Sequence, residues 1–183
     1  VTPLMISLAY RWKILDRPGE RKIHQKVMPR LGGLAIVISF IFPLLSGAFL
    51  VALAKSGWLD KERWPGLAQL HLPGMISVMP KLFYFLAGGI AIFIIGLLDD
   101  LKDLGPGKKL LAEFIVIVVM VVSGMRLSIF PEAPLLAGIL TIIWMLSITN
   151  AFNLLDNMDG LSAGVALVSS LIFLTIASSQ QQY

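Results

Sequence analysis

Three aspartates close together, Asp99, Asp100 and Asp103, form the first cluster that could do chemistry. Asp99 and Asp103 are four residues apart, so on a helix their carboxylates point the same way, and Asp100 adjoins Asp99. Carboxylates this close repel one another unless a cation lies between them, and Mg²⁺ suits a few carboxylates together with phosphate oxygens. The alternative is a solvated helix end at which Lys102 supplies the countercharge.

A second polar cluster repeats every third residue and contains Asn150, Asn153, Asp156 and Asp159. On a helix this spacing gives a polar stripe that drifts slowly around the axis. A further helix is expected from about Leu161, and Asp159 as its N-cap would explain only one of the four residues. The start of that helix would also offer free backbone N–H groups to a bound phosphate. We therefore interpret the stripe as functional.

The third cluster is a basic segment, residues 21–33, which includes His24 and Arg30. Its end, residues 29–33, holds a proline and two adjacent glycines, which predict a tight entry into the next helix where the backbone can approach a ligand closely. The simpler interpretation is a positively charged anchor for anionic lipid.

Two lysines, Lys108 and Lys109, are expected to open a helix that continues through Glu113. A cation at a helix N-terminus opposes the helix dipole, so these lysines are misplaced for stability but well placed to meet an anion. Glu113 lies one turn after Lys109, and a simple ion pair between the two is expected.

The composition indicates what kind of protein must position these residues. Of 183 residues, 57% are hydrophobic and 14% charged, the mean hydropathy is +0.84, and there is no cysteine. A soluble domain is typically about a quarter charged. The composition therefore excludes a soluble globular enzyme, a disordered tail and a disulfide-stapled secreted domain, and it favours an integral membrane protein.

The spacing of charges predicts membrane spans. Residues 31–54, 82–98, 133–155 and 160–183 carry no charge, and residues 110–125 carry only Glu113. A spanning helix needs about 20 mostly apolar residues, and in lipid a helix satisfies its own backbone. With residues 1–10 as the tail of an earlier helix, we expect an all-α polytopic membrane helix bundle, with five full spans and one partial span forming a single membrane domain over residues 1–183. The stretch 55–81, with its tryptophans and prolines, is expected to lie along the membrane interface.

The segment from Arg11 to Arg30, both included, holds seven basic residues, which predicts that this loop is cytoplasmic. Alternation then places residues 99–109 and 150–159 on the same face. The three polar clusters would converge there, offering acids for a metal, amides for hydrogen bonds and cations for phosphates. This arrangement fits chemistry on a phosphorylated lipid with a soluble phosphorylated partner, and it does not fit a nucleic-acid-binding face.

Two other classes of protein use acids in membranes. A transporter that relays protons or ions would carry acids deep in its spans, whereas the apolar runs hold only Glu113, close to an end. A membrane prenyltransferase would use acid-rich loops and Mg²⁺ but would not need the segment 21–33. A non-catalytic lipid-binding fragment is a further alternative.

Taken together, the motifs resemble those of the polyprenyl-phosphate N-acetylhexosamine-1-phosphate transferases of glycosyltransferase family 4. The resemblance is closer to the bacterial undecaprenyl-phosphate N-acetylglucosamine-1-phosphate transferases than to the phospho-MurNAc-pentapeptide transferases. It rests on three strings that occur in this order: Arg21-Lys22-x-His24-x4-Pro29-Arg30-x-Gly32-Gly33, Gly96-x2-Asp99-Asp100-x2-Asp103-x5-Lys109 and Asn150-x2-Asn153-x2-Asp156-x2-Asp159-Gly160.

The resemblance implies a reaction. A sugar 1-phosphate would pass from a UDP-sugar to undecaprenyl phosphate, giving an undecaprenyl-diphosphate sugar and UMP, with Mg²⁺ or alternatively Mn²⁺ as the cofactor. The enzyme would be a multi-pass protein of the bacterial inner membrane with its active site on the cytoplasmic face, serving cell-wall or lipopolysaccharide synthesis. The sugar, the polymer and the oligomeric state stay open, with a homodimer as one option.

The resemblance also assigns roles to single residues. It implies a metal held by Asn153, Asp99 and Asp100, catalytic roles for Asp99, Asp100, Asp156 and Asp159, and substrate contacts for Lys109, Asp103, Asn150, Asn153, His24 and Arg30. The family has further helices, with another metal-binding aspartate and a histidine-containing loop in its later half. We therefore expect this chain to be the N-terminal half of a larger transferase and to be inactive alone.

Overall fold

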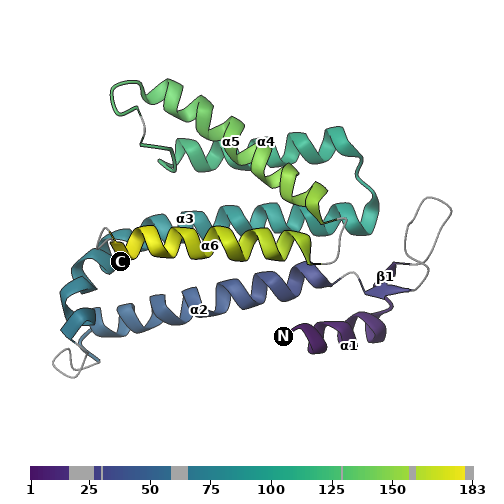
Figure 1. Ribbon diagram of the computed structural model, residues 1–183, viewed down its shortest axis with the longest axis horizontal. Helices are drawn as coiled ribbons and strands as arrows, with labels where there is room; N and C mark the ends of the chain where they lie inside the picture. Colours follow the sequence, from purple (N-terminus) through teal and green to yellow (C-terminus); the bar gives the residue numbers. More distant parts are fainter. Residues whose placement is uncertain (17–26, 30, 59–65, 129, 157–159, 180–183) are drawn as a thin grey trace. The chain divides into compact units, whose positions relative to one another are not determined.

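The computed structural model describes residues 1–16, 27–29, 31–58, 66–128, 130–156 and 160–179, and for residues 28 and 67–70 the backbone only. These residues form six helices and one pair of two-residue strands (Figure 1). The elements are α1 (Thr2–Trp12), β1 (Leu15–Asp16), β2 (Met28–Pro29), α2 (Gly32–Lys55), α3 (Gly66–Lys102), α4 (Pro106–Val122), α5 (Pro134–Leu155) and α6 (Leu161–Ser179). The predicted helical fold is therefore confirmed, apart from the short strand pair.

Four helical segments of the described chain are long and apolar enough to cross a membrane: α2, His71–Lys102 of α3, α5 and α6. This supports a multi-pass helical membrane protein, but the predicted count of five full spans and one partial span is not confirmed. The difference lies in α4, whose 17 residues extend about 26 Å at 1.5 Å per residue, less than a hydrocarbon core of about 30 Å.

The end of α4 is set by its local sequence. Gly124 adopts a left-handed backbone with φ of 97°. The Gly124 N–H donates to the Val121 carbonyl and the Met125 N–H to the Met120 carbonyl, both at 3.1 Å. This pair of bonds is the Schellman motif, in which a glycine after the helix lets the chain close over the last carbonyls. The helix therefore stops at Val122 although residues 114–122 are all apolar.

The chain divides into two compact units, unit 1 (Val1–Ala112) and unit 2 (Glu113–Tyr183). In unit 1, β1 pairs antiparallel with β2, with Leu15 opposite Pro29 and Asp16 opposite Met28. A small core beside this pair joins Met5 and Ala9 of α1 to the start of α2. The strand pair, which the sequence did not predict, thus places residues 28–29 of the basic segment 21–33 beside Leu15 and Asp16.

Helices α2 and α3 pack together within unit 1. Val51 and Ala54 of α2 form a buried cluster with Leu72 near the start of α3. Toward the other end, a Cβ at Gly33 would lie 3.6 Å from the Phe93 ring. The two helices are therefore antiparallel, and the start of α2 lies at the same end of the pair as the last turns of α3.

The first turns of α3 differ from the expectation for residues 55–81. Residues 66–81 are not a separate segment but belong to the same 37-residue helix as the span. Pro73 and Pro80 lie inside this helix, and a proline removes a backbone hydrogen bond and bends a helix without ending it when the neighbouring turns are held. In Figure 1 the early part of α3 runs at an angle to the rest.

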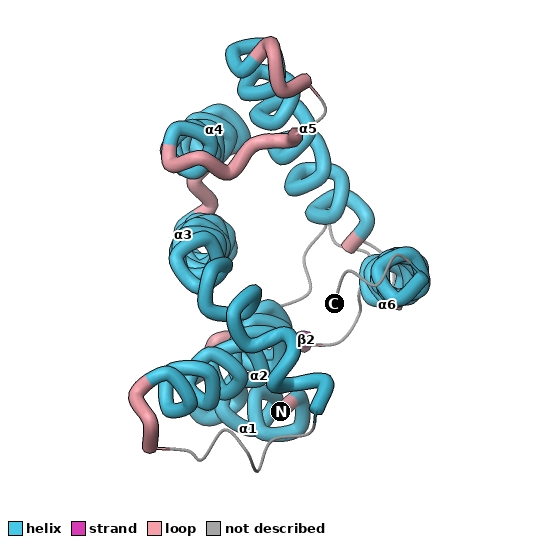
Figure 2. The backbone as a smooth tube through the Cα atoms, turned by 90° about the vertical axis from the view of Figure 1, so that its left-hand side faces the viewer, coloured by secondary structure: helices cyan, strands magenta, loops and turns pink. Residues whose placement is uncertain are grey.

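In unit 2, α4 and α5 meet at local contacts and do not pack along their whole length (Figure 2). The buried residues of α4, Glu113, Ile117 and Met120, follow the spacing of one helix face. On α5 the buried residues are the small ones Ala137, Gly138 and Thr141. Small residues allow local contacts of this kind between helices in membranes.

The hydroxyl group of Thr141 holds the turn between α4 and α5 against α5. The Leu127 N–H donates to Thr141 Oγ1 at 3.0 Å, and the Thr141 hydroxyl donates to the Ala137 carbonyl at 2.6 Å. An exposed turn is thereby tied to a buried side chain of α5. In contrast, α6 has no residue that the rest of the described chain buries.

The close approach at Gly138 can be tested by enlarging this residue. A Cβ there would lie 3.4 Å from Val121 Cγ1, so Gly138→Leu should push α5 away from α4. Overpacking of this kind costs about 1–3 kcal/mol, and we expect a lower midpoint of thermal unfolding in detergent. The matched control is Gly47→Leu in α2, at an exposed position where nothing lies within 4 Å of the added Cβ, so the midpoint should not fall. Equal midpoints for the two variants would contradict the packing described for α4 and α5.

Candidate functional site

The junction between α3 and α4 is a tight turn that ends one helix and begins the next. Asp103 and Gly105 have φ of 47° and 81°, and Pro106 is the first residue of α4. A residue before proline avoids the helical region, whereas proline itself suits the first helical position. The Asp103 N–H donates to the Asp99 carbonyl at 2.8 Å, which caps α3. Asp103 therefore lies outside the helix, and the expectation that it shares a helical face with Asp99 is wrong.

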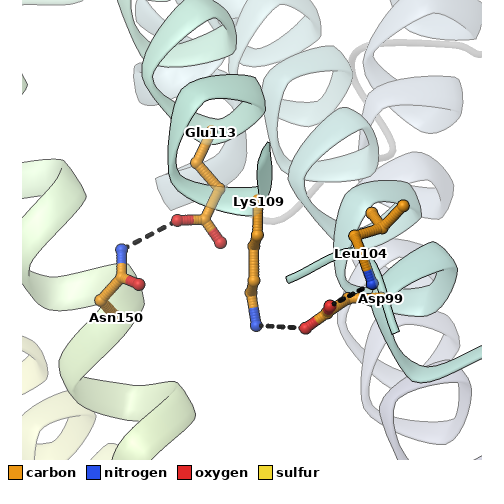
Figure 3. A network of polar contacts seen from close by, with 5 residues as sticks. All are labelled: Asp99, Leu104, Lys109, Glu113 and Asn150. Carbon is orange, nitrogen blue, oxygen red and sulfur yellow. Dashed lines mark hydrogen bonds and ion pairs between the residues drawn. The ribbon is translucent and has the colours of Figure 1, made fainter. Parts of the chain in front are cut away.

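Asp99 and Lys109 form the central ion pair of this junction (Figure 3). Lys109 Nζ lies 3.0 Å from Asp99 Oδ2, and the two side chains are 12% and 26% exposed. The other carboxylate oxygen, Oδ1, accepts a hydrogen bond of 3.2 Å from the Leu104 N–H. Two residues that the sequence singled out, ten positions apart, are thus in direct contact.

The helix dipoles explain why this contact is favourable. Asp99 is near the C-terminal end of α3, where the dipole is negative, and Lys109 is near the N-terminal end of α4, where it is positive. Each charge is unfavourable for its own helix. The ion pair offsets both effects at once, and the short turn between the helices keeps the two groups within reach.

The expected pair between Lys109 and Glu113 is wrong, because each has another partner. Glu113 is only 3% exposed, and its Oε2 accepts a hydrogen bond of 2.8 Å from Asn150 Nδ2 (Figure 3). Asn150 Nδ2 also donates to the Leu146 carbonyl at 3.0 Å. Sequence reasoning named Glu113 only as a partner for Lys109 and missed its contact with Asn150. The isolation of Glu113 in an apolar run was the available signal, since an acid in such a run has to find a polar partner.

Asp156, the third residue of the polar stripe, lies just beyond the end of α5. Asp156 follows the helix, with its N–H donating to the Phe152 carbonyl at 3.2 Å. Asp156 Oδ1 accepts a hydrogen bond of 2.9 Å from the Ser162 hydroxyl in the first turn of α6. The carboxylate therefore ties the end of α5 to the start of α6. Ser162 was not predicted, although it continues the every-third-residue spacing of the stripe, three positions after Asp159.

The start of α6 at Leu161 is confirmed. Gly160 directly precedes it with φ of 76°, and the Gly160 carbonyl accepts the Gly164 N–H at 2.8 Å. Gly160 thus occupies the N-cap position that was considered for Asp159. Asp159 itself lies outside the described residues.

The remaining candidates lie on helix ends or outside the described chain. Asp100 is exposed in the last turn of α3, and Asn153 is exposed near the end of α5. His24 and Arg30 are outside the described residues. Among the described residues, no three His, Asp or Glu side chains gather as a ready-made metal site. Asp99 and Asp100 belong to unit 1 and Asn153 to unit 2, so a metal site shared by the three stays a prediction.

Comparison with known proteins decides the family. The sequence profile described as "Glycosyl transferase family 4" matches residues 82–183, more than half of the chain. The chain belongs to glycosyl transferase family 4. The matched region contains both the Asp99–Lys109 junction and the stripe that begins at Asn150.

Several relatives extend the similarity over nearly the whole family 4 chain. A Bacillus subtilis protein named "Probable undecaprenyl-phosphate N-acetylglucosaminyl 1-phosphate transferase" is 30% identical, with 92% of this chain and 42% of that protein covered. A Thermotoga maritima protein named "Undecaprenyl-phosphate alpha-N-acetylglucosaminyl 1-phosphate transferase" is 28% identical, with 94% and 46% covered. A Mycolicibacterium smegmatis protein named "Decaprenyl-phosphate N-acetylglucosaminephosphotransferase" is 30% identical, with 90% and 38% covered.

This family 4 chain therefore spans less than half the length of the curated relatives it matches. No solved structure is significantly similar to it.

A double-mutant cycle tests the ion pair of the family 4 chain. Lys109→Met should lower the free energy of unfolding by about 1 kcal/mol, the upper range for a partly exposed pair. Asp99→Asn should cost a similar amount, and the double variant should cost less than the sum, because interacting residues show a coupling of about 0.5–3 kcal/mol. Unfolding in denaturant, followed in detergent, measures all three.

The neighbouring lysine provides the control for this cycle. Lys108 is exposed at the same helix end, and Lys108→Met removes a cation from the positive end of the dipole. This variant should therefore be as stable as the wild type or slightly more stable. Equal losses for Lys108→Met and Lys109→Met would contradict the ion pair.

Proposed function

We propose that the complete protein containing this chain transfers N-acetylhexosamine 1-phosphate from a UDP-sugar to undecaprenyl phosphate. Family membership and the names of the relatives support this class of reaction. The observation that carries the proposal for this chain is the contact between Asp99 and Lys109. This ion pair joins a carboxylate and an ammonium group of the motif at the end of a long apolar helix, where a lipid phosphate would arrive.

The reaction requires alignment and charge neutralisation more than covalent help from the protein. An oxygen of the lipid phosphate would bond to the phosphorus that carries the sugar, the P–O bond to the uridine monophosphate would break, and UMP would leave with the bridging oxygen. Lys109, mostly shielded from solvent, would neutralise diphosphate charge, because a cation acts more strongly where water is scarce. Asp99 would hold Lys109 in position before the substrate binds.

The donor chemistry at the end of α3 fits a divalent cation. Asp99 and Asp100 are adjacent carboxylates, Asp100 is exposed, and carboxylate oxygens are ligands that Mg²⁺ or Mn²⁺ accepts while keeping several waters. We propose Asp99 and Asp100, with Asn153, as the residues that would hold the ion. The ion would supply neutralisation of the charge on the transferring phosphoryl group.

The other roles follow the resemblance. Asp156 and Asp159 are proposed as further catalytic acids, and Asp103, Asn150, Asn153, His24 and Arg30 as substrate contacts. The site is proposed to face the cytoplasm from the inner membrane of a bacterium. The shared end of α2 and α3 in unit 1 supports this, since the start of α2 follows the basic loop.

Release of UMP tests the proposed reaction. With UDP-N-acetylglucosamine, the complete protein should release UMP only when undecaprenyl phosphate is present. Asp99→Asn, Asp100→Asn and Asp156→Asn should each lower the rate by about 10²–10³, the usual cost of removing one preorganised charge from such a site. Membrane expression should be unchanged. The control is Glu132→Gln, an exposed acid in the turn between α4 and α5, which should keep its rate. UMP release unaffected by all three aspartate substitutions would reject the site.

Chelation tests the cation. Removal of divalent ions with EDTA should abolish UMP release, and Mg²⁺ should restore it. Asp100→Glu keeps a carboxylate but displaces it. The Mg²⁺ concentration for half-maximal rate should therefore rise about tenfold, because changes to residues around a metal typically lower metal affinity by about this factor. Activity that persists after chelation, or an unchanged Mg²⁺ requirement in this variant, would contradict the assignment.

A further inference from the structure

We propose that Glu113 is a positioning residue, which holds the side chain of Asn150 so that its carbonyl oxygen is presented to an N–H or O–H group of the nucleotide sugar. The inference rests on the proposed function for the identity of that substrate. Its structural part, the fixed orientation of Asn150, stands on contacts within unit 2 alone.

The hydrogen bonds of Asn150 determine which end of its amide is occupied. Glu113 Oε2 and the Leu146 carbonyl both accept from Nδ2, at 2.8 and 3.0 Å. A carbonyl oxygen only accepts, so the nitrogen of the amide has to face it. Both N–H groups of Asn150 are therefore used within the protein. Among the described residues, no hydrogen bond to Asn150 Oδ1 is found, and this oxygen is the group left for a ligand.

The burial of Glu113 makes this orientation rigid. At 3% exposure, its carboxylate has little access to solvent, so the bond from Asn150 replaces hydration that the acid has lost. Breaking such a bond leaves a buried acceptor unsatisfied, which costs more than the bond itself contributes. Asn150 is therefore held from two directions, by its own helix at Leu146 and by α4 at Glu113.

Asn150 Oδ1 can bind only a group that donates a hydrogen bond. Phosphate oxygens are acceptors and cannot bond to a carbonyl oxygen, so Asn150 is not a phosphate-binding amide. A hydroxyl of a sugar, the N–H of an acetamido group and the N–H of uracil are donors of the required kind. Glu113 thus prepares, within unit 2, an acceptor for an uncharged part of the nucleotide sugar.

Substitution of Glu113 separates positioning from plain packing. Glu113→Leu fills similar space but offers no acceptor, so the amide of Asn150 loses one of its two anchors. Glu113→Gln keeps an acceptor oxygen at the same distance along the side chain. Ile117→Ala, one turn further along the buried face of α4, weakens the packing without touching Asn150 and is the matched control.

The kinetic test uses the complete protein with UDP-N-acetylglucosamine, undecaprenyl phosphate and Mg²⁺. Glu113→Leu should raise KM for the UDP-sugar about tenfold, which is the loss expected for one substrate hydrogen bond. KM for undecaprenyl phosphate and the Mg²⁺ requirement should not change. Glu113→Gln should return KM for the UDP-sugar to within about twofold of the wild type, since its oxygen still accepts. Ile117→Ala should lower the thermal midpoint and leave the ratio of the two KM values unchanged.

Three kinetic results would overturn the proposal. The first is a Glu113→Leu variant that shifts both KM values equally or behaves like Ile117→Ala, which indicates packing alone. The second is a Glu113→Gln variant as impaired as Glu113→Leu. The third is a change in the Mg²⁺ requirement in place of the KM for the UDP-sugar, which would assign the Asn150 oxygen to a cation.

A measurement that needs no activity distinguishes failure of this inference from failure of the proposed function. The side-chain amide signal of Asn150 in ¹⁵N-asparagine-labelled protein, assigned by its disappearance in Asn150→Asp, should exchange slowly with solvent in the wild type and in Glu113→Gln. It should exchange faster in Glu113→Leu. Equal exchange in all three overturns the inference. Slow wild-type exchange without any UMP release overturns the proposed function and the assigned ligand, while the hold of Glu113 on Asn150 is confirmed.

Discussion

Polar side chains placed at the ends of apolar helices have to find partners inside the protein, and this constraint organises the described chain. Lipid offers no hydrogen bonds, so an unpartnered polar group there costs several kcal/mol. Asp99 meets Lys109 and the Leu104 N–H. Glu113 meets Asn150. Both contacts join one helix to the next, so the groups that could do chemistry also fix the ends of the helices that carry them.

Helix α4 has a special position because it takes part in both contacts. Lys109 and Glu113 are four residues apart, one turn of this helix, and each has a partner from a different neighbouring helix. One turn therefore supplies a cation, suited to phosphate, and a buried acceptor that orients an amide. In the proposed reaction, Lys109 is assigned to the diphosphate of the donor, and the amide that Glu113 orients is assigned to an uncharged group.

The apolar surfaces of the chain follow a different rule. Large hydrophobic side chains are exposed along α2, α5 and α6, as befits helices that cross a membrane, since lipid tails solvate them as well as a protein core does. The helices are held instead by small residues and short-range polar bonds. Gly138 beside Val121 and Thr141 at the Leu127 N–H are the examples in unit 2.

The sequence by itself determined the helical class, most helix positions and the family. Apolar runs free of charge can only be helices in lipid, and the motifs around Asp99 and Asn150 were specific enough to indicate glycosyl transferase family 4 before any comparison. The start of α6 at Leu161 was also predicted. The same runs suggested five spans, because charge counting does not register a glycine at position 124 that ends α4 early.

The tertiary structure alone decided which polar groups meet. The sequence suggested Glu113 for Lys109 and a shared helical face for Asp99 and Asp103, because helical spacing was the only geometry available. Both expectations failed at the turn over residues 103–105, where a left-handed aspartate and glycine end α3 and bring Lys109 back to Asp99. Spacing along one helix is a local property. The partner of a side chain depends on where a turn sends the next helix, and that direction is fixed only when the helices pack.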